Sequence, residues 1–326
     1  MSYTFTQESF ESLTSFQDNL EYGLGWSSVF VLPVWLKIWW LEFKPEEELY
    51  LGAVRRDEEV IGIAPLLLKD DTASFLGSID VCDYLDFVVT PGEEREFFNF
   101  LLDELKQRGI SSLDLRSLRP DSTVLTWLVD ITRERGYETT CQQEDVTVEL
   151  ELPSSWEEYL TMLASKQRHE VRRKLRRLPE AGKADFHIIE DSVSIQKGMK
   201  TFLKMFTESR SDKASFMTDQ KESFFRAMAN SMTEAGLLRL GVLELDTLPT
   251  AMIMYFDYNG CIYLYNSGYD PKYDYLSVGL LSKVLCIRES IQEGKKIFDF
   301  LKGNEVYKYH LGGKEIPLSR CRIAIK

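Results

Sequence analysis

One arrangement of strands and helix occurs twice along the chain, and this repetition limits the fold more than any other feature. "LGAVRRDEEVIGIAPLLL", from residue 51, and "LGVLELDTLPTAMIMYF", from residue 240, both read as strand, turn, strand. Farther along, "NFLLDELKQRGISSLDLRSL" and "SKVLCIRESIQEGKKIFDFLKG" both read as helix, glycine, strand. The pattern predicts two copies of an ααβββαβ unit, with chance alignment of short segments as the alternative.

The length supports the same division. With 326 residues the chain exceeds the usual size of one domain, and a hydrophobic content of 44% suffices for two cores. We therefore predict an α/β (α+β) chain with one domain over residues 1–147 and a second over residues 148–326. In the first domain, a strand is expected at "DYLDFVV", and helices are expected near residues 8–21, 33–43, 92–109 and 122–135.

Charge and hydropathy exclude several classes of protein. The formal net charge of −13 disfavours general nucleic-acid binding. The N-terminus lacks the basic and apolar segments of a secretory signal, and "VFVLPVWLKIWW", interrupted by Pro33 and Lys37, is too short to cross a bilayer. We interpret this aromatic stretch as core packing, with a partner or membrane-surface contact as the alternative. Its tryptophans are Trp35, Trp39 and Trp40, and Trp26 lies just before it.

The cysteines indicate a reducing compartment. They are odd in number, widely spaced and without a CxxC motif, so we expect reduced thiols, no disulfide framework and no metal site. These expectations favour a cytoplasmic protein. The five are Cys82, Cys141, Cys261, Cys286 and Cys321.

A single strongly basic segment, "KQRHEVRRKLRRL" at residues 166–178, stands out in this acidic chain. We predict one helix from Pro153 to about Pro179, with Ser155 and Glu158 as a capping box. The spacing places a row of arginines along one edge of the apolar face, where Arg168 and Arg172 could bind an anionic substrate. Solvent exposure, the usual state of such runs, is the alternative, and we prefer it for Arg173, Lys174 and Arg177.

Several of these segments together resemble a known family. "SWEEYLTMLASKQRHEVRRKLRRL" and the closing "FDFLKGNEVYKYHLGG" resemble the GNAT-superfamily acetyltransferase domain of CelD-type polysaccharide-biosynthesis proteins, and more distantly the FemABX peptidyltransferases. "PVWLKIWW", "GIAPLLL" and "DYLDF" extend the resemblance over nearly the whole chain. It implies two tandem GNAT-like domains, each with a mixed, mostly antiparallel central sheet flanked by helices, and a C-terminal acyltransferase domain.

The resemblance also implies where a donor would bind. The strand at residues 262–269 would splay from its neighbour at 298–301, and the following helix would offer its N-terminus to phosphate through Ser277, Val278 and Gly279. The segment "KYDYLSVG" lacks the close glycine pair of ordinary acetyltransferases. Acyl-CoA or acetyl-CoA is the expected co-substrate, with aminoacyl-tRNA as a second donor class that Fem-type relatives use.

Acyl transfer to an amine needs a base, donors for the oxyanion and an acid for the leaving group. Lys308 matches the family's closing Gly-x-x-x-Tyr-Lys pattern and is the leading catalytic candidate, with an ordinary surface lysine as the alternative. Tyr307 and Tyr265 could donate a proton or simply pack. Asp299 could be the base, or could cap or pair with a cation.

The N-terminal domain offers an acceptor-side candidate. In "VCDYLDF", Asp83, Tyr84 and Asp86 form a polar cluster that could receive an amine or a sugar hydroxyl, although turn chemistry explains the aspartates equally well. The sequence therefore predicts a cytoplasmic N-acyltransferase acting on an amine of a small-molecule, cell-envelope or polysaccharide precursor. A Fem-like aminoacyl-tRNA-dependent aminoacyltransferase and a non-catalytic GNAT-fold binding module are the alternatives; no DNA partner and no transmembrane segment are expected.

Overall fold

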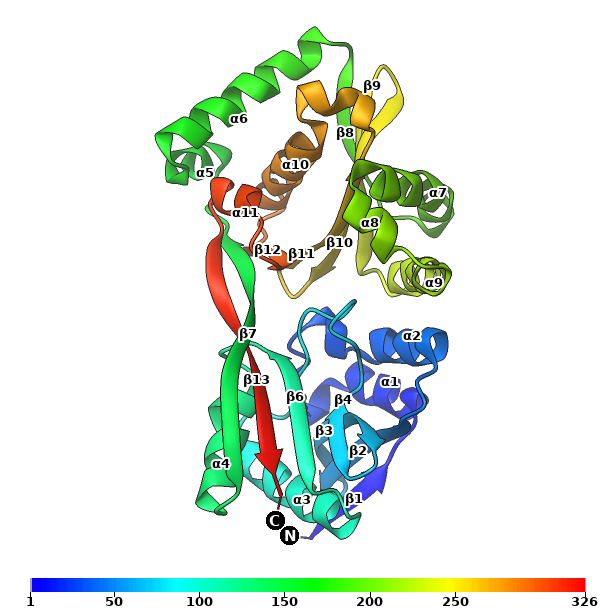
Figure 1. Cartoon of the computed structure of the whole chain (residues 1–326), viewed down its shortest axis with the longest axis vertical. Helices are drawn as coiled ribbons and strands as arrows, with labels where there is room; N and C mark the ends of the chain where they lie inside the picture. The colour runs from blue at the N-terminus through cyan, green and yellow to red at the C-terminus, as the bar shows by residue number, and fades with distance from the viewer. Residues whose placement is uncertain (1, 326) are drawn as a thin grey trace. The chain divides into compact units, whose positions relative to one another are not determined.

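The computed structural model describes residues 2–325, which form two compact units. The first unit contains the chain up to Val146 and again from Ile316, and the second contains Thr147–Glu315 (Figure 1). The expected second domain, residues 148–326, thus differs at its end. The reason is that the C-terminal strand pairs with a strand of the first unit, from Ser319 opposite Leu118 to Ala324 opposite Ser112.

The first unit is a twisted sheet covered by helices. The long central strand, β3, is buried from Val60 to Leu68, because other parts of the unit cover both faces of the sheet there. The structure adds a strand, β1, that the sequence did not predict, and reduces the expected strand "DYLDFVV" to two residues. The elements are β1 (Tyr3–Gln7), α1 (Phe10–Asp18), α2 (Pro33–Phe43), β2 (Glu48–Arg56), β3 (Glu59–Lys69), β4 (Thr72–Phe75), β5 (Val88–Val89), α3 (Glu94–Gln107), β6 (Ser112–Leu118), η3 (Val124–Leu128), α4 (Val129–Glu134), β7 (Glu138–Glu151) and β13 (Lys314–Ala324).

The second unit has helices on both faces of its sheet. Figure 1 shows α10 and α7 on different sides of this sheet. Side chains of the central strand, β10, point to the two faces in turn, so that Ile253 packs against α10 and Met252 against α7. The elements are α5 (Trp156–Met162), α6 (Ser165–Arg177), β8 (Ala184–Ile189), α7 (Ser192–Ser209), α8 (Ser211–Phe216), α9 (Asp219–Glu234), β9 (Leu238–Leu245), β10 (Leu248–Tyr258), β11 (Cys261–Tyr269), η5 (Pro271–Leu276), α10 (Val278–Gln292), β12 (Ile297–Lys302) and α11 (Val306–His310).

Both units have the same strand order, which confirms the predicted tandem α/β fold. In the first, the order is β1-β2-β3-β4-β6-β13, and in the second it is β8-β9-β10-β11-β12-β7. In each, the four leading strands are antiparallel neighbours, a helix follows, and the fifth strand pairs in parallel, as β6 does with β4 and β12 with β11. The repeat in the sequence is therefore a repeat in the structure.

In each unit's strand order, the sixth strand is not the next strand along the chain. β13, from the C-terminal end of the chain, pairs with β6, whereas β7, which runs from the first unit into the second, pairs with β12. Both β7 and β13 contain the residues at which the chain passes from one unit to the other. The second unit is therefore an insertion into the first.

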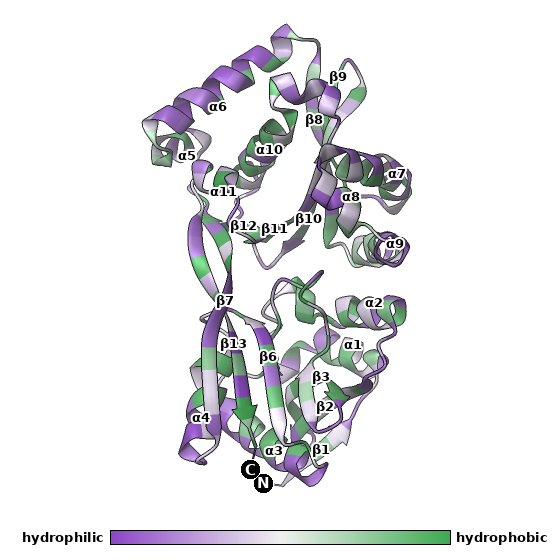
Figure 2. Cartoon of the chain, viewed as in Figure 1, coloured by the Kyte–Doolittle hydropathy of each residue, from purple (hydrophilic) through white to green (hydrophobic). Residues whose placement is uncertain are grey.

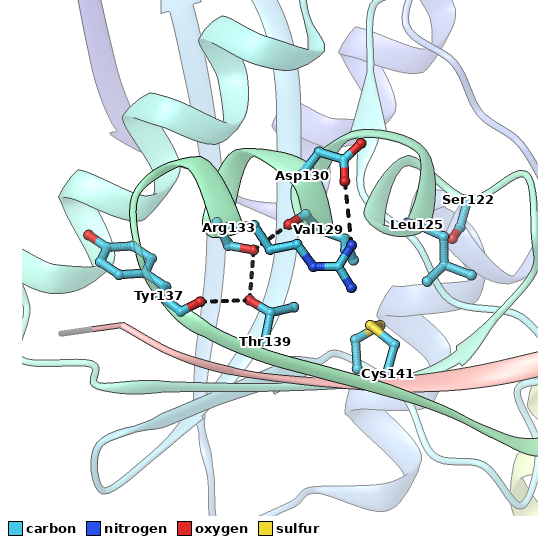
Figure 3. The surroundings of a disulfide bond; sticks show 10 residues. Ser122, Leu125, Val129, Asp130, Arg133, Tyr137, Thr139 and Cys141 are labelled. Atoms are coloured by element: carbon cyan, nitrogen blue, oxygen red, sulfur yellow. Dashed lines mark hydrogen bonds and ion pairs between the residues drawn. A yellow bond between two sulfur atoms is a disulfide. The ribbon is translucent and has the colours of Figure 1, made fainter.

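A disulfide joins these two strands, which corrects the prediction of five reduced thiols. Cys141 of β7 is bonded to Cys321 of β13, at a sequence separation of 180 residues. Figure 3 shows Cys141 beneath the helical segment that carries Leu125 and Arg133. No sequence pattern indicates this pair, because the two cysteines become neighbours only when the sheet forms. Cys82, Cys261 and Cys286 are not disulfide-bonded.

The aromatic stretch near the N-terminus lies largely in the core, as expected. Trp35 and Trp39 are buried within α2, and the edge of the Phe30 ring packs against Trp35. Pro33 occupies the first turn of α2, where its missing N–H costs nothing. Among residues 2–325, no helix is both long and apolar enough to cross a membrane.

Candidate functional site

Two neighbouring strands of the second unit separate, as the family resemblance implies. The parallel strands β11 and β12 pair only from Cys261 to Tyr263, opposite residues 297–299, although β11 continues to Tyr269. A bulge lies just beyond, because Leu264 and Asn266 pair with consecutive residues of β10 and leave Tyr265 without a partner Cα. The backbone of β11 beyond this bulge is therefore open on the side of β12.

A pocket of about 350 Å³ opens beside the separated end of β11. Four of its side chains are cationic and two are carboxylic, so it suits a negatively charged ligand. The whole lining comes from the second unit: Lys174, Arg210, Lys213, Ser267, Tyr269, Asp274, Ser277, Gly279, Leu280, Lys283, Glu305 and Tyr307.

The start of α10 forms one wall of this pocket. Ser277 takes a left-handed conformation, with φ of 58°, and begins the helix. A Cβ at Gly279 would lie 2.8 Å from the Tyr269 ring, so only glycine allows the ring to cover this turn. Of the three predicted cofactor-binding residues, Ser277 and Gly279 line the pocket, whereas Val278 is buried in the core. The first N–H groups of an α-helix lack intrahelical acceptors and attract anions.

Two lysines, the buried Lys283 and the partly buried Lys213, converge on one residue of β11. Lys283 donates hydrogen bonds to the Ser267 hydroxyl at 3.0 Å and to the Gly279 carbonyl at 2.8 Å. Lys213 donates a short hydrogen bond to the Ser267 carbonyl. Burial lowers the pKa of Lys283 to about 7 and that of Lys213 to about 8, helped in the first case by Lys213 and in the second by Arg210.

Tyr307 brings a phenol to the same pocket. Its ring centroid lies 5.1 Å from the Lys283 ammonium, and burial raises the pKa of its hydroxyl, which therefore keeps its proton at neutral pH. A phenol of this kind can donate a proton to a leaving group. Tyr307 is thus a predicted catalytic residue that the structure places in the pocket.

Lys308 and Asp299 instead hold the end of β12 in shape. The Lys308 ammonium, whose side chain is 2% exposed, donates to the carbonyls of Leu301, Lys302 and Gly303 at 2.7–3.0 Å and pairs with Glu305 at 2.9 Å. The Asp299 carboxylate accepts hydrogen bonds from the Leu301 N–H at 2.8 Å and from the Thr147 hydroxyl at 3.3 Å. Leu301 has a φ of 61° within an irregular pairing of β12 with β7. Both side chains therefore stabilise this strained turn, and neither lines the pocket.

Tyr265, the fourth predicted catalytic residue, packs among rings. Its centroid lies 5.6 Å from that of Phe225 and 5.2 Å from that of Phe256. Its position at the bulge shapes β11, but its side chain is not part of the pocket lining.

The basic helix presents to the pocket the edge opposite to the expected one. Lys174 lines the pocket, whereas Arg168 and Arg172 do not, and Arg172 is 55% exposed beside Glu157. The predicted continuous helix is in fact two, α5 and α6, separated by the extended backbone of Leu163 and Ala164. The apolar row of α6 has a basic edge on each side, and sequence periodicity alone does not determine which edge faces α10. Figure 2 shows how hydrophilic α6 is along its length.

A smaller basic pocket adjoins the first. It has a volume of about 40 Å³ and shares Lys174 and Ser277 with the larger one. Arg173 and Arg177, expected in solvent, line it together with Tyr275 and Leu276. The Arg173 guanidinium already binds the Glu170 carboxylate through two hydrogen bonds, at 3.1 and 2.8 Å.

The predicted acceptor residues lie in the first unit and contribute to its packing. Tyr84 is buried, with the edge of its ring against Phe30 and the Arg119 guanidinium 4.9 Å from its centroid. Asp86 is also buried and accepts hydrogen bonds from the Thr123 amide and hydroxyl, at 2.8 and 2.6 Å. Asp83, which is half-buried, precedes this pair on the same loop.

Asp86 should make stability depend on pH. Burial raises its pKa from 3.8 to about 6, so between these values the folded state holds a proton that the unfolded state releases. The free energy of unfolding should therefore fall, by roughly 3 kcal/mol, as the pH rises from about 4 to about 6. Urea unfolding at several pH values measures this slope. Asp86→Asn should remove it and the exposed Asp18→Asn should not; an unchanged slope in Asp86→Asn would contradict the assignment.

One group of side chains could hold a metal ion. Asp185 and His187 of β8 and Glu244 of β9 place ligand atoms within 4.8 Å of one another on the sheet surface. The Asp185 carboxylate already contacts Nδ1 of His187 at 3.3 Å. These residues do not belong to the pocket.

Sequence reasoning missed most of the pocket lining. Lys213 and Ser267 do not belong to any sequence motif, and Arg210 has the sequence surroundings of an ordinary surface residue. Lys283 did leave a signal, because it is the only charged residue in "GLLSKVLCI", an apolar run of α10. A lysine in such an apolar run is expected to be buried, and buried lysines are rare unless they are paired.

Comparison with known proteins agrees with this geometry. Residues 165–309 match a family model described as "Acetyltransferase (GNAT) domain". No curated protein sequence matches the chain. Among solved structures, FemX has a TM-score of 0.67 at 13% identity, with 98% of this chain and 96% of that chain covered. A conserved protein of unknown function from Bacteroides thetaiotaomicron has a TM-score of 0.63 at 12% identity, covering 99% and 100%.

A third structure has the tandem arrangement in its description. It is a tandem GNAT protein from the clavulanic acid biosynthesis pathway, with a TM-score of 0.51, 11% identity and 98% of each chain covered. At such low identity these structures establish a shared fold. The second unit therefore matches the GNAT acetyltransferase family model over residues 165–309, and the chain has a fold that it shares with FemX and with a tandem GNAT protein.

Proposed function

We propose that the second unit is an N-acyltransferase whose donor lies in the opening between β11 and β12. The observation that carries this proposal is the cationic pocket at the separated end of β11, bounded by the first turn of α10. In the reaction, the nitrogen of an amine attacks the acyl carbonyl, the carbon bond to the donor's sulfur or oxygen breaks, and the amine loses a proton. We assign to Tyr307, which lines the pocket, the protonation of the leaving atom, and the proton released by the amine restores the tyrosine hydroxyl.

The proposed donor is an acyl-CoA, because anionic phosphates suit the cations of the pocket and the start of α10. From the family resemblance, we propose an acceptor amine on a small-molecule, cell-envelope or polysaccharide precursor. A cytoplasmic location belongs to the same proposal, and the Cys141–Cys321 disulfide is the observation that argues against it.

Calorimetric titration with acetyl-CoA, longer acyl-CoAs and free coenzyme A tests the donor. Saturable binding supports the proposal, and turnover with an amine then identifies the reaction. Tyr307→Phe keeps the ring and removes the hydroxyl, so kcat should fall about 100-fold with KM little changed. Tyr309→Phe, in the same helix and outside the pocket, is the matched control. Failure of every acyl-CoA to bind overturns this donor.

A second candidate is aminoacyl transfer from charged tRNA. It is favoured by the similarity to FemX over 98% of the chain and by the absence of a glycine pair before α10. The basic side chains of α6 would then contact the RNA backbone. Affinity for tRNA should fall steeply with salt, with a slope on the order of several phosphates. A tRNA affinity that does not change with salt removes this candidate. Failure of both acyl-CoA and tRNA to bind favours a non-catalytic binding module.

A further inference from the structure

Two lysines of the second unit, Lys283 and Lys308, are buried and a third, Lys213, is partly buried; of these three, only Lys308 has a carboxylate within ion-pair distance. Lys308 pairs with Glu305 at 2.9 Å, as buried cations normally do. Lys283 is 7% exposed, and its hydrogen bonds reach only the neutral oxygens of Ser267 and Gly279. Lys213 likewise reaches a neutral oxygen, the Ser267 carbonyl. Within residues 2–325, no carboxylate forms an ion pair with either Lys213 or Lys283.

This arrangement is costly in the free protein. Removing an ammonium from water disfavours its charged form, and a second ammonium nearby increases the cost, which the more distant Glu305 carboxylate offsets only in part. Both lysines line the pocket and approach the same residue of β11 from different helices, α8 and α10. A negatively charged group entering the pocket would remove the cost for both.

We propose that Lys213, Lys283 and the Ser267 hydroxyl together bind an oxyanion, a phosphate or carboxylate group of the ligand, inside the pocket. The two ammonium groups would supply charge, and the hydroxyl a hydrogen bond. Such binding occupies the pocket that carries the proposed transferase function, but it requires no transfer reaction. The inference therefore stands or falls independently of the donor.

Binding should be accompanied by proton uptake. At pH 7.5, a pKa of about 7 leaves most Lys283 side chains neutral, and a pKa of about 8 leaves a minority of Lys213 neutral. An anion raises both pKa values, so the protein should take up about one proton per ligand at pH 7.5 and close to none at pH 6. The other charged and titratable groups that face this pair are Lys174, Arg210, Asp212, Tyr269, Asp274, Cys286, Glu305, Tyr307 and Lys308.

Titration calorimetry of the whole chain with inorganic phosphate, and separately with acetate, tests the inference. Each is measured at pH 7.5 in two buffers of different ionisation enthalpy, so that the heat reports the protons taken up. Saturable binding of either anion with uptake of about one proton supports the proposal. Phosphate binding alone indicates a phosphate ligand, and acetate binding alone indicates a carboxylate. Binding of neither, or binding without proton uptake, overturns it.

Variants then locate the site. Lys283→Met and Lys213→Met should each weaken anion binding at least about tenfold, because each removes a charge-assisted hydrogen bond. Lys204→Met, on the exposed face of α7, should bind as the wild type does. If Lys283→Met and Lys213→Met bound the anion as tightly as Lys204→Met and the wild type do, the proposal would be overturned. The proton uptake of the wild-type protein needs no variant, so it remains decisive if a substitution prevents folding.

The two possible failures are distinguishable. Lysine-dependent binding of phosphate or acetate, together with no response to acyl-CoA or tRNA, would leave the oxyanion site and remove the transferase proposal. Binding and turnover of an acyl-CoA with unchanged affinity in Lys283→Met and Lys213→Met would do the opposite.

Discussion

Replacing Cys141 and Cys321 together by serine should lower the free energy of unfolding by about 5 kcal/mol, because the disulfide closes a loop of 180 residues in the unfolded chain. The loss of chain entropy on cross-linking grows with the logarithm of loop length, and this loop contains the whole of the second unit. Urea unfolding of the oxidised protein and of the double variant measures the difference.

The redox state of the same two residues provides the control. A reductant should shift the unfolding midpoint of the wild type towards that of the double variant and leave the variant unchanged. Cys261→Ser, at a half-buried cysteine outside the disulfide, should retain the full response to reductant. Equal midpoints for the oxidised and reduced wild type, or titration of five free thiols in the folded protein, would contradict the disulfide.

Lys308→Met should destabilise the protein by about 3–5 kcal/mol, the usual loss when one partner of a buried charged network is removed. The substitution leaves three carbonyl groups at the end of β12 without their shared donor and removes the partner of Glu305. Thermal and urea unfolding measure the effect, with the exposed Lys314→Met as the matched control.

The same variant separates the two roles considered for this lysine. A structural lysine predicts loss of stability, and activity lost only as far as the pocket is disturbed. A catalytic lysine predicts nearly unchanged stability with turnover lost. Wild-type stability in Lys308→Met would therefore contradict the contacts described at the end of β12.

Much of the fold could be predicted because it depends on local patterns that the chain contains twice. The pair β2 and β3, like β9 and β10, shows apolar strands around a short polar turn, and α3 and α10 each end at a glycine. The origin of the sixth strand of each sheet was not predictable. β13 is an ordinary strand by sequence, and only long-range pairing decides that it joins β6.

The site could be predicted only in part, for a related reason. The family pattern located the start of α10 and Tyr307, which do line the pocket. It also selected Lys308, and strand alternation selected Asp299, but both side chains stabilise the turn at Leu301 and neither lines the pocket. Arg168 and Arg172 were chosen by helical phase, and the break at Ala164 and the packing of α6 on α10 put Lys174 at the pocket instead.

The insertion of the second unit into the first also affects the order in which the chain can mature on the ribosome. β7 has no neighbour within the first unit until β13 is made, because β13 lies between β6 and β7. The residues of the second unit up to Gly313 leave the ribosome before β13 does, so the inserted unit can fold while its host still exposes unpaired strand edges. The part synthesised first is therefore completed last.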